Sequence, residues 1–547
     1  MTSGRTVINL MKVNQLVGVS WCVHIKVGVF FFLSVSQTDM SATLLLLLLL
    51  LSLLTLLIGF FRRRTRQPGE PPLIDGWIPY VGKALAYGRD AQKFLEEQRA
   101  IHGDVFTVQL FGRYMTFVMN PLLYPYVMKH GPQLDFHPIS DRISSYAFGF
   151  PPLTNNPNRG LKEQVMRGHQ FLKGANVEAM LGSFRDNLML VLRQDHVGEQ
   201  ATPPGPGGWW STTVEEFCSS AVFTAVILTI FGKPPDDDDG RRRRSDLQVW
   251  RKKLYDFDRM FPFLAAQCPV WLLGRTSWNR RTLQEYFLPQ KMKSWSNSAL
   301  FTQNRLKIFD QYDDMQDIHK AAHHFAILWA STINTVPSAF WCLNGALTSS
   351  EATAKLRAEL KDNCGLGDTE LSTDVRLTRE DLDKLVYLDS LVNEGLRVSA
   401  ASIPPRLVLE DTTIQLGSAG SVHVRKGDIV GLFPLSTHMD PEIYDDPETF
   451  KFDRFVQDGQ KKTDFYKNGQ RLKHYLLPFG YGASRCPGQG FALYSIKLFI
   501  SVVLLNFEVQ VDEGQTRPCP NRMRGGLGTL PPIGDTRFRY RLWVPGA

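Results

Sequence analysis

The chain has 547 residues, of which 43% are hydrophobic, and it carries a net charge of +8 at pH 7. Its length and apolar content allow a large buried core. The seven cysteines form no CxxC pair and no even framework, which excludes a disulfide-stapled domain and indicates a reducing compartment. The positive charge suits anionic partners such as lipid headgroups or an acidic redox protein. No nucleic-acid motif accompanies it, so we expect no nucleic-acid partner.

A candidate membrane anchor lies near the start of the chain. Residues 42–61 carry no charge and are mostly leucine, and a helix of that length spans roughly 30 Å, about one bilayer core. Arginines follow at once, at 62, 63, 64 and 66, which by the positive-inside rule places the rest of the chain in the cytosol. We therefore expect a transmembrane anchor at residues 40–61 and a basic, proline-rich linker at 62–75.

Residues 1–39 fit this plan poorly. Their apolar stretch, residues 17–35, is interrupted by His24 and Lys26, and Met40 directly precedes the anchor. We expect residues 1–39 to be an upstream extension, with translation normally starting at Met40. The alternative is a second membrane segment that forms a hairpin with the first.

Two short segments after the linker predict a β-hairpin. Residues 103–110 and 114–119 alternate apolar and polar side chains, and 111–113 lie between them as a turn. Further on, residues 257–273 are rich in aromatic and apolar residues interrupted by prolines. This second pattern allows either core or a membrane-dipping lid, and we favour the lid.

Residues 319–347 predict one long helix with a defect. Pro337 lies in its interior, where the ring clashes with the carbonyl of Ile333 and opens the helix locally. The amide of Asn334 and the hydroxyl of Thr335 would then line a groove that holds O2 and a water for proton delivery. These two residues are our candidate catalytic residues. The alternative is a simple kink with satisfied polar groups.

Glu394 and Arg397 stand three residues apart, on one face of a predicted helix, where they can pair and reach a third group. We expect that group to be Arg454. These three residues would keep the fold, so we do not count them as catalytic.

The most informative stretch is residues 478–488, which precede an apolar helix-like run at 491–505. Cys486 opens that helix, and the partial positive charge of a helix N-terminus favours a thiolate, which is a good iron ligand. Gly482 and Gly488 lack a Cβ, so the backbone can lie flat against a planar cofactor, and Phe479 can pack beneath the sulfur. The alternative, a buried structural cysteine, leaves the Glu394, Arg397 and Arg454 pattern unexplained.

The order of Glu394, Arg397, Arg454 and Cys486, with the spacing of Phe479, Gly482 and Gly488 around the cysteine, resembles the haem-thiolate monooxygenases of the cytochrome P-450 family. The resemblance covers residues 68–540. Segments 68–80, 328–337 and 464–475 look like its steroid branch, which contains cholesterol 7α-hydroxylase, oxysterol 7α-hydroxylase, sterol 12α-hydroxylase and prostacyclin synthase. Segments 217–220, 424–428 and 458–463 most resemble the oxysterol 7α-hydroxylases.

This resemblance implies a mainly α fold with a small β part, formed by residues 76–547, and haem b as the cofactor. Cys486 would be the axial ligand of the iron. Arg406, His438 and Arg485 stand where family members contact the haem propionates. Ser484 replaces an arginine that many members carry, and Asn334 departs from the usual acid followed by threonine.

The resemblance also implies hydroxylation of an oxysterol or 3β-hydroxysteroid, with O2 and with electrons from NADPH through the cytochrome P-450 reductase. The enzyme would be a single-pass protein of the endoplasmic reticulum membrane, in contact with lipid, with a cytosolic catalytic domain. Five basic residues would either dock the reductase or form an ordinary solvated loop: Lys461, Lys462, Lys467, Arg471 and Lys473. Alternatives are a sterol 12α-hydroxylase, a cholesterol 7α-hydroxylase, an endoperoxide isomerase like prostacyclin synthase, and a haem-binding protein without turnover.

Overall fold

The computed structural model describes residues 44, 46–48, 50–54, 64–198, 204–235, 240–364 and 377–543. It divides into two units, residues 1–65 and 66–547. In the first unit the described residues between 44 and 54 are helical, with exposed leucines. The expected extension at 1–39 and the second half of the expected anchor lie outside the described residues, so both stay predictions.

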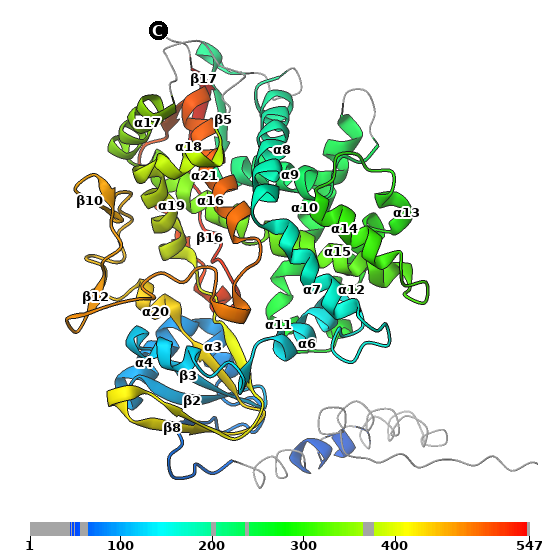
Figure 1. Cartoon of the computed structure of the whole chain (residues 1–547), viewed down its shortest axis with the longest axis vertical. Helices are drawn as coiled ribbons and strands as arrows, with labels where there is room; N and C mark the ends of the chain where they lie inside the picture. Colours follow the sequence, from blue (N-terminus) through cyan, green and yellow to red (C-terminus); the bar gives the residue numbers. More distant parts are fainter. Residues whose placement is uncertain are drawn as a thin grey trace, which may run out of the picture. The chain divides into compact units, whose positions relative to one another are not determined.

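The second unit is mainly helical, as predicted (Figure 1). Its α-helices are α3 (Ala84–Arg89), α4 (Ala91–His102), α5 (Tyr124–Met128), α6 (His137–Phe148), α7 (Leu161–Gly168), α8 (Ala175–Val191), α9 (Val214–Ile230), α10 (Arg241–Arg259), α11 (Phe261–Ala265), α12 (Thr276–Tyr286), α13 (Pro289–Met292), α14 (Leu300–Phe309), α15 (Asp317–Thr332), α16 (Thr335–Leu347), α17 (Ser350–Cys364), α18 (Arg379–Lys384), α19 (Val386–Ser399), α20 (Pro434–His438) and α21 (Gln489–Asn506).

Helices α9, α16 and α21 form the centre of the main hydrophobic core, and each is apolar on nearly all sides because other helices surround it. Helix α16 packs against α9, α19 and α21. The stretch Asp317–Leu347 and helix α21 are long and apolar enough to cross a bilayer, but most of each is buried inside the unit. They are therefore core helices.

A six-stranded sheet lies at one end of this unit, with α3 and α4 close to it (Figure 1). Its strands, in spatial order, are β1 (Leu73–Ile74), β2 (Val105–Leu110), β3 (Arg113–Val118), β9 (Ile429–Leu432), β6 (Pro405–Val408) and β4 (Leu134–Asp135). The predicted hairpin is confirmed as β2 and β3, with Thr107 opposite Thr116. Phe111 and Gly112 form its turn with φ of 47° and 72°.

Smaller sheets complete the β part. A three-stranded sheet joins β14 (Phe507–Val511), β17 (Arg537–Leu542) and β5 (Trp210–Thr213). The two-stranded pairs are β7 (Thr412–Gln415) with β8 (Ser421–Val424), β10 (Val456–Gln457) with β11 (Gln460–Lys461), β12 (Tyr466–Lys467) with β13 (Gln470–Arg471), and β15 (Cys519–Pro520) with β16 (Pro532–Ile533). The strands of the last pair enclose the C-terminal loop, residues 521–531, which contacts α3 and α4.

The predicted long helix is interrupted where the proline requires it. Helix α15 ends at Thr332 and α16 begins at Thr335, so Ile333 and Asn334 lie between them. The break precedes Pro337 by one turn because the ring of a proline clashes with the carbonyl four residues earlier.

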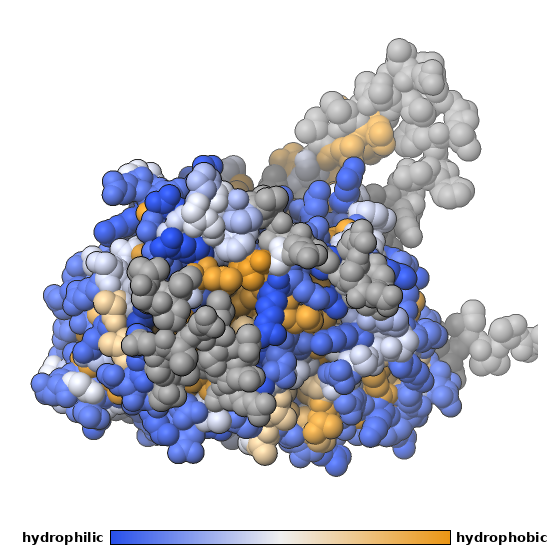
Figure 2. Space-filling model, turned by 90° about the horizontal axis from the view of Figure 1, so that it is seen from above, coloured by the Kyte–Doolittle hydropathy of each residue, from blue (hydrophilic) through white to orange (hydrophobic). Residues whose placement is uncertain are grey.

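Residues 257–273 are partly core and partly exposed, and the membrane-dipping lid stays a prediction. Phe257, Phe261 and Leu264 are buried in the main core. Trp271 is 75% exposed and Leu272 is 60% exposed, so this part presents an apolar surface. Figure 2 shows one face of the molecule, on which hydrophilic residues predominate and hydrophobic ones form small patches.

Candidate active site

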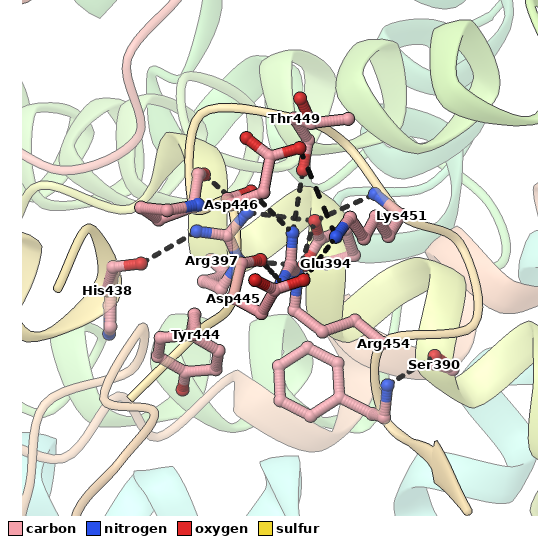
Figure 3. A network of polar contacts seen from close by, with 12 residues as sticks. Ser390, Glu394, Arg397, His438, Tyr444, Asp445, Asp446, Thr449, Lys451 and Arg454 are labelled. Carbon is pink, nitrogen blue, oxygen red and sulfur yellow. Dashed lines mark hydrogen bonds and ion pairs between the residues drawn. The ribbon is translucent and has the colours of Figure 1, made fainter. Parts of the chain in front are cut away.

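A buried carboxylate and two guanidinium groups form the polar centre that the sequence predicted (Figure 3). Helix α19 places Glu394 and Arg397 one turn apart, and two hydrogen bonds of 2.7 and 2.8 Å join their side chains. Arg454 Nε lies 3.0 Å from both carboxylate oxygens of Glu394. The side chains of Glu394 and Arg397 are fully buried and that of Arg454 is 6% exposed. The expected contact of Arg454 with this pair is confirmed.

The two arginines also bind backbone carbonyls of the segment that leads to the cysteine loop. Arg397 donates to the carbonyls of His438 and Pro447 at 2.7 and 2.8 Å, and Arg454 donates to that of Thr449 at 2.7 Å. The network therefore fastens residues 438–454 to α19, which is a structural role.

The cysteine loop is a tight turn in front of α21. Its amide at Cys486 donates to the carbonyl of Phe479 at 2.9 Å, and Gly480 and Gly482 have φ of 62° and 55°. A Cβ on Gly480 would lie 2.8 Å from the carbonyl oxygen of Ser484, so a side chain there would disrupt the turn. Phe479 packs against the main core. Its expected place beneath the sulfur of Cys486 stays a prediction.

The sulfur of Cys486 receives two opposing influences. The amides of Gly488 and Gln489 donate toward it and lower its pKa, but burial by surrounding protein atoms is the larger effect and raises the pKa above its usual value. Solvent nevertheless reaches the side chain, because the protein atoms packed around the sulfur do not cover it completely. The protein groups alone thus favour the thiol, whereas coordination to a metal ion would stabilise the thiolate.

Arg406 on β6 supports the same loop. Its Nη2 donates to the carbonyl of Tyr481 and to the hydroxyl of Ser484, both at 3.0 Å. The side chain is 6% exposed, and its Nη1 is buried without a hydrogen-bond partner among the described residues. A buried unpaired donor is costly, and a carboxylate is the acceptor that best satisfies a guanidinium.

This donor set fits haem. Cys486 offers a sulfur ligand, and Arg406 offers an unpaired donor for a propionate. The expected contacts of Gly482 and Gly488 with the cofactor stay predictions. In the sequence, Ser484 was notable only because many family members carry an arginine at its position. Its hydroxyl instead fixes the guanidinium of Arg406, a role that the residue type did not reveal.

The expected propionate contacts of His438 and Arg485 stay predictions. His438 Nδ1, like Arg406 Nη1, is buried without a hydrogen-bond partner among the described residues. His438 is fully buried, its Nε2 accepts a hydrogen bond from the amide of Leu477 at 3.1 Å, and burial together with Arg397 lowers its pKa to about 3. The ring is therefore neutral and belongs to the surroundings of the Glu394 network. Arg485 is exposed, and its Nε donates to the side chain of Gln489 at 2.9 Å.

At the helix break, the two catalytic candidates, Asn334 and Thr335, have different surroundings. The side-chain oxygen of Asn334 accepts the amide of Thr529 from the C-terminal loop at 3.0 Å. The carbonyl of Asn334 accepts both the amide and the hydroxyl of Ser338, at 3.1 and 2.8 Å. Thr335 is 7% exposed and begins α16. Sequence reasoning missed the bond to Thr529, although the glycines of residues 525–528 indicate a backbone that approaches its neighbours closely.

The predicted docking residues are mostly paired with acids. Lys461 lies 3.3 Å from Asp389, and Lys467 is buried with contacts of 2.6 and 2.9 Å to Asp440 and Glu442. Arg471 pairs with Asp464, whereas Lys462 lies over the ring of Phe465 and Lys473 is exposed. The loop therefore offers less free positive charge than its composition predicts.

A cavity of about 560 Å³ lies elsewhere, between α8, α9, α10 and β5. Its walls include three arginines and two tryptophans: Arg243, Arg244, Arg251, Trp209 and Trp210. None of its lining residues belongs to the cysteine loop or to the helix break, so it is separate from the site described above.

Comparison with known proteins agrees with this geometry. The family model described as Cytochrome P450 matches residues 71–537. The chain is 35% identical to Cytochrome P450 7B1 of Mus musculus and 36% identical to Cytochrome P450 7A1 of Sus scrofa, over 88% of this chain and 92% and 95% of theirs. It is 34% identical to the 7-alpha-hydroxycholest-4-en-3-one 12-alpha-hydroxylase of Homo sapiens, over 88% of this chain and 94% of that one. With Cys486 at the head of α21 and Arg406 beside its loop, the chain belongs to the cytochrome P450 family.

Proposed function

We propose that the protein is a haem-dependent monooxygenase that hydroxylates oxysterols or 3β-hydroxysteroids at the 7α position. The observation that carries the proposal is the cysteine loop, which presents the Cys486 thiol and is bound by a buried guanidinium, Arg406, that keeps an unpaired donor. The sterol class is supported by relatives named Cholesterol 7-alpha-monooxygenase and 12-alpha-hydroxylase.

Bound haem would supply the oxygen chemistry, in which one atom of O2 enters a C–H bond, the other leaves as water, and NADPH supplies the electrons. Cys486 would hold the iron and Arg406 would bind a propionate. Because the side-chain oxygen of Asn334 is engaged by Thr529, we assign proton delivery to the hydroxyl of Thr335. Asn334 then keeps the C-terminal loop against the helix break.

We further propose that the enzyme is a single-pass protein of the endoplasmic reticulum membrane, with its catalytic unit in the cytosol. Two groups of exposed apolar side chains support contact with lipid, namely Trp77 and Tyr80 in the first and Trp271 and Leu272 in the second. Tyr80 lies against Gly112, and the neighbouring Arg113 donates to Gln267 at 2.6 Å, so the two groups flank one region of the surface. A water-insoluble sterol would enter from the bilayer there.

The test is turnover of 25-hydroxycholesterol by the purified haem-loaded protein with the cytochrome P-450 reductase and NADPH. We expect a 7α-hydroxylated product that depends on NADPH, identified by mass and retention time. The matched control, Cys486→Ser, should lose the absorption band of the reduced carbon monoxide complex that reports thiolate ligation, and should give no product. NADPH-independent rearrangement of a prostaglandin endoperoxide, without sterol oxidation, would instead identify an isomerase.

A further inference from the structure

Three segments that are distant in the sequence meet at one carboxylate. Asp258 lies near the end of α10, Trp329 lies on α15, and Arg524 lies in the C-terminal loop. The indole N–H of Trp329 donates to Asp258 Oδ1 at 2.8 Å, and Arg524 Nη2 donates to the same oxygen at 3.0 Å. Arg524 Nη1 lies 2.8 Å from Asp258 Oδ2 and also donates to the Asp258 carbonyl at 2.8 Å. We call these three residues the Asp258 triad.

The Asp258 triad buries charged groups, and this costs desolvation free energy, so stability alone does not explain it. The side chains of Arg524 and Asp258 are 10% and 14% exposed, and Arg524 Nε is buried without a hydrogen-bond partner among the described residues. Replacing a buried ion pair with apolar residues is often neutral or stabilising, so the pair is weak evidence for a purely stabilising role. Burial raises the pKa of Asp258, while the charge of Arg524 and the two side-chain donors oppose the rise. Removal of Arg524 would therefore favour a protonated carboxyl that accepts the indole N–H more weakly.

The indole held by the triad belongs to α15, the helix that leads to the candidate oxygen site. Trp329 precedes Thr335 on the interrupted helix by six positions, and its neighbour Ala330 is exposed. The ring stacks on Phe261 of α11 at 4.1 Å and lies 5.6 Å from Phe148 of α6. The loop that provides Arg524 also provides Thr529, which binds Asn334. One loop therefore fixes both the indole and the helix break.

We propose that Arg524 is a positioning residue for the sterol, acting through Asp258 on the orientation of the Trp329 indole. With the indole fixed, the sterol has one favoured placement relative to Thr335, and a single ring carbon faces the reacting centre. This inference rests on the proposed sterol hydroxylation and adds the source of its regiochemistry. A misplacement of about 1 Å can cost about 100-fold in rate, so a modest tilt of the indole has a large effect.

The experiment compares the haem-loaded full chain carrying Arg524→Gln, Arg524→Lys, Trp329→Phe and the double change Arg524→Gln with Trp329→Phe. We expect Arg524→Gln to lower kcat about tenfold or more, with a smaller change in KM, and to raise the share of sterol hydroxylated at other carbons. Arg524→Lys should recover much of both. Because Arg524 acts through Trp329, the double variant should be no slower than Trp329→Phe within about twofold.

The matched control is Arg522→Gln on the same loop. Arg522 is 41% exposed and lies 3.6 Å from the exposed Glu448, so its loss should leave rate and product distribution unchanged. Haem content and the carbon monoxide band are measured for every variant, and if Arg524→Gln takes up no haem, Arg524→Lys and Trp329→Phe carry the test. An unchanged product distribution in these variants, or rate losses that multiply in the double variant, would overturn the inference. A wild-type protein that oxidises no sterol would overturn the proposed function, and this inference with it.

Discussion

Replacing Glu394 with glutamine should destabilise the protein severely. The carboxylate of Glu394 is fully buried and is the shared acceptor of Arg397, Arg454 and the amide of Lys451. Glutamine preserves the shape but removes the charge that neutralises two guanidinium groups. Breaking a buried ion pair on one side costs about 3–5 kcal/mol, which is about two to four powers of ten in the unfolding equilibrium. Since domains are stable by about 5–15 kcal/mol, this loss is a large share of the total.

The assay is urea unfolding of the haem-loaded protein, followed by circular dichroism and by haem absorbance, after the two transitions have been shown to coincide in the wild type. The control is Glu285→Gln, which breaks an exposed pair with Arg281 at a similar distance of 2.9 Å. The control should lose about 0.5 kcal/mol or less. If the unfolding midpoint of Glu394→Gln coincides with that of Glu285→Gln, the network does not stabilise the fold as described.

Three further predictions address pH, proton delivery and the cofactor. Burial lowers the pKa of His196 from 6.5 in the unfolded chain to about 4 in the folded protein. As pH falls, the unfolded chain therefore binds a proton at His196 before the folded protein does, and stability that is present above pH 6.5 is lost as pH falls toward 4. This residue alone should lower the free energy of unfolding by about 2 kcal/mol between pH ~7.5 and pH ~5. Urea unfolding of His196→Gln should therefore show a correspondingly smaller fall over the same pH range. If the variant and the wild type have the same pH profile, the assignment to His196 is wrong. Thr335→Val should lower kcat about 100-fold with sterol affinity retained, while Thr335→Ser stays active, and equal rates for all three proteins would exclude the hydroxyl from proton delivery. Arg406→Gln should lower haem content and haem affinity, measured by titration of the apoprotein, whereas Arg485→Gln should not; the opposite ranking would transfer the propionate contact to Arg485.

The parts of the fold set by local chemistry were predictable from the sequence. The strands β2 and β3 follow from alternating side chains and a turn, and the interruption between α15 and α16 follows from Pro337. The network of Glu394, Arg397 and Arg454 follows from helical spacing and the absolute need of a buried charge for partners. In each case the cause lies within a few residues of its effect, or in a pairing rule that admits few partners.

The remaining features depend on contacts between distant segments. His438 and Arg406 look equally suited to bind a carboxylate, but their surroundings differ: the amide of Leu477 donates to Nε2 of the imidazole, while β6 brings Arg406 to Ser484. The residue types alone did not distinguish these outcomes. Likewise, a lysine-rich loop predicts free positive charge, whereas Asp389, Asp440 and Asp464 arrive from other places in the chain or the loop and neutralise much of it.

The contact between the C-terminal loop and the helix break limits how this chain and its relatives can vary. Gly528 has φ of 114°, and a Cβ there would lie 2.2 Å from the side-chain oxygen of Asn334. Any larger residue at 528 would therefore need a different residue at 334, a different loop path, or both. Positions 334 and 528 should consequently change together in an alignment of relatives, although they lie 194 positions apart in the chain. An asparagine at this point of the helix then indicates that a glycine-containing loop packs against the helix break, and it does not by itself indicate a particular oxygen chemistry.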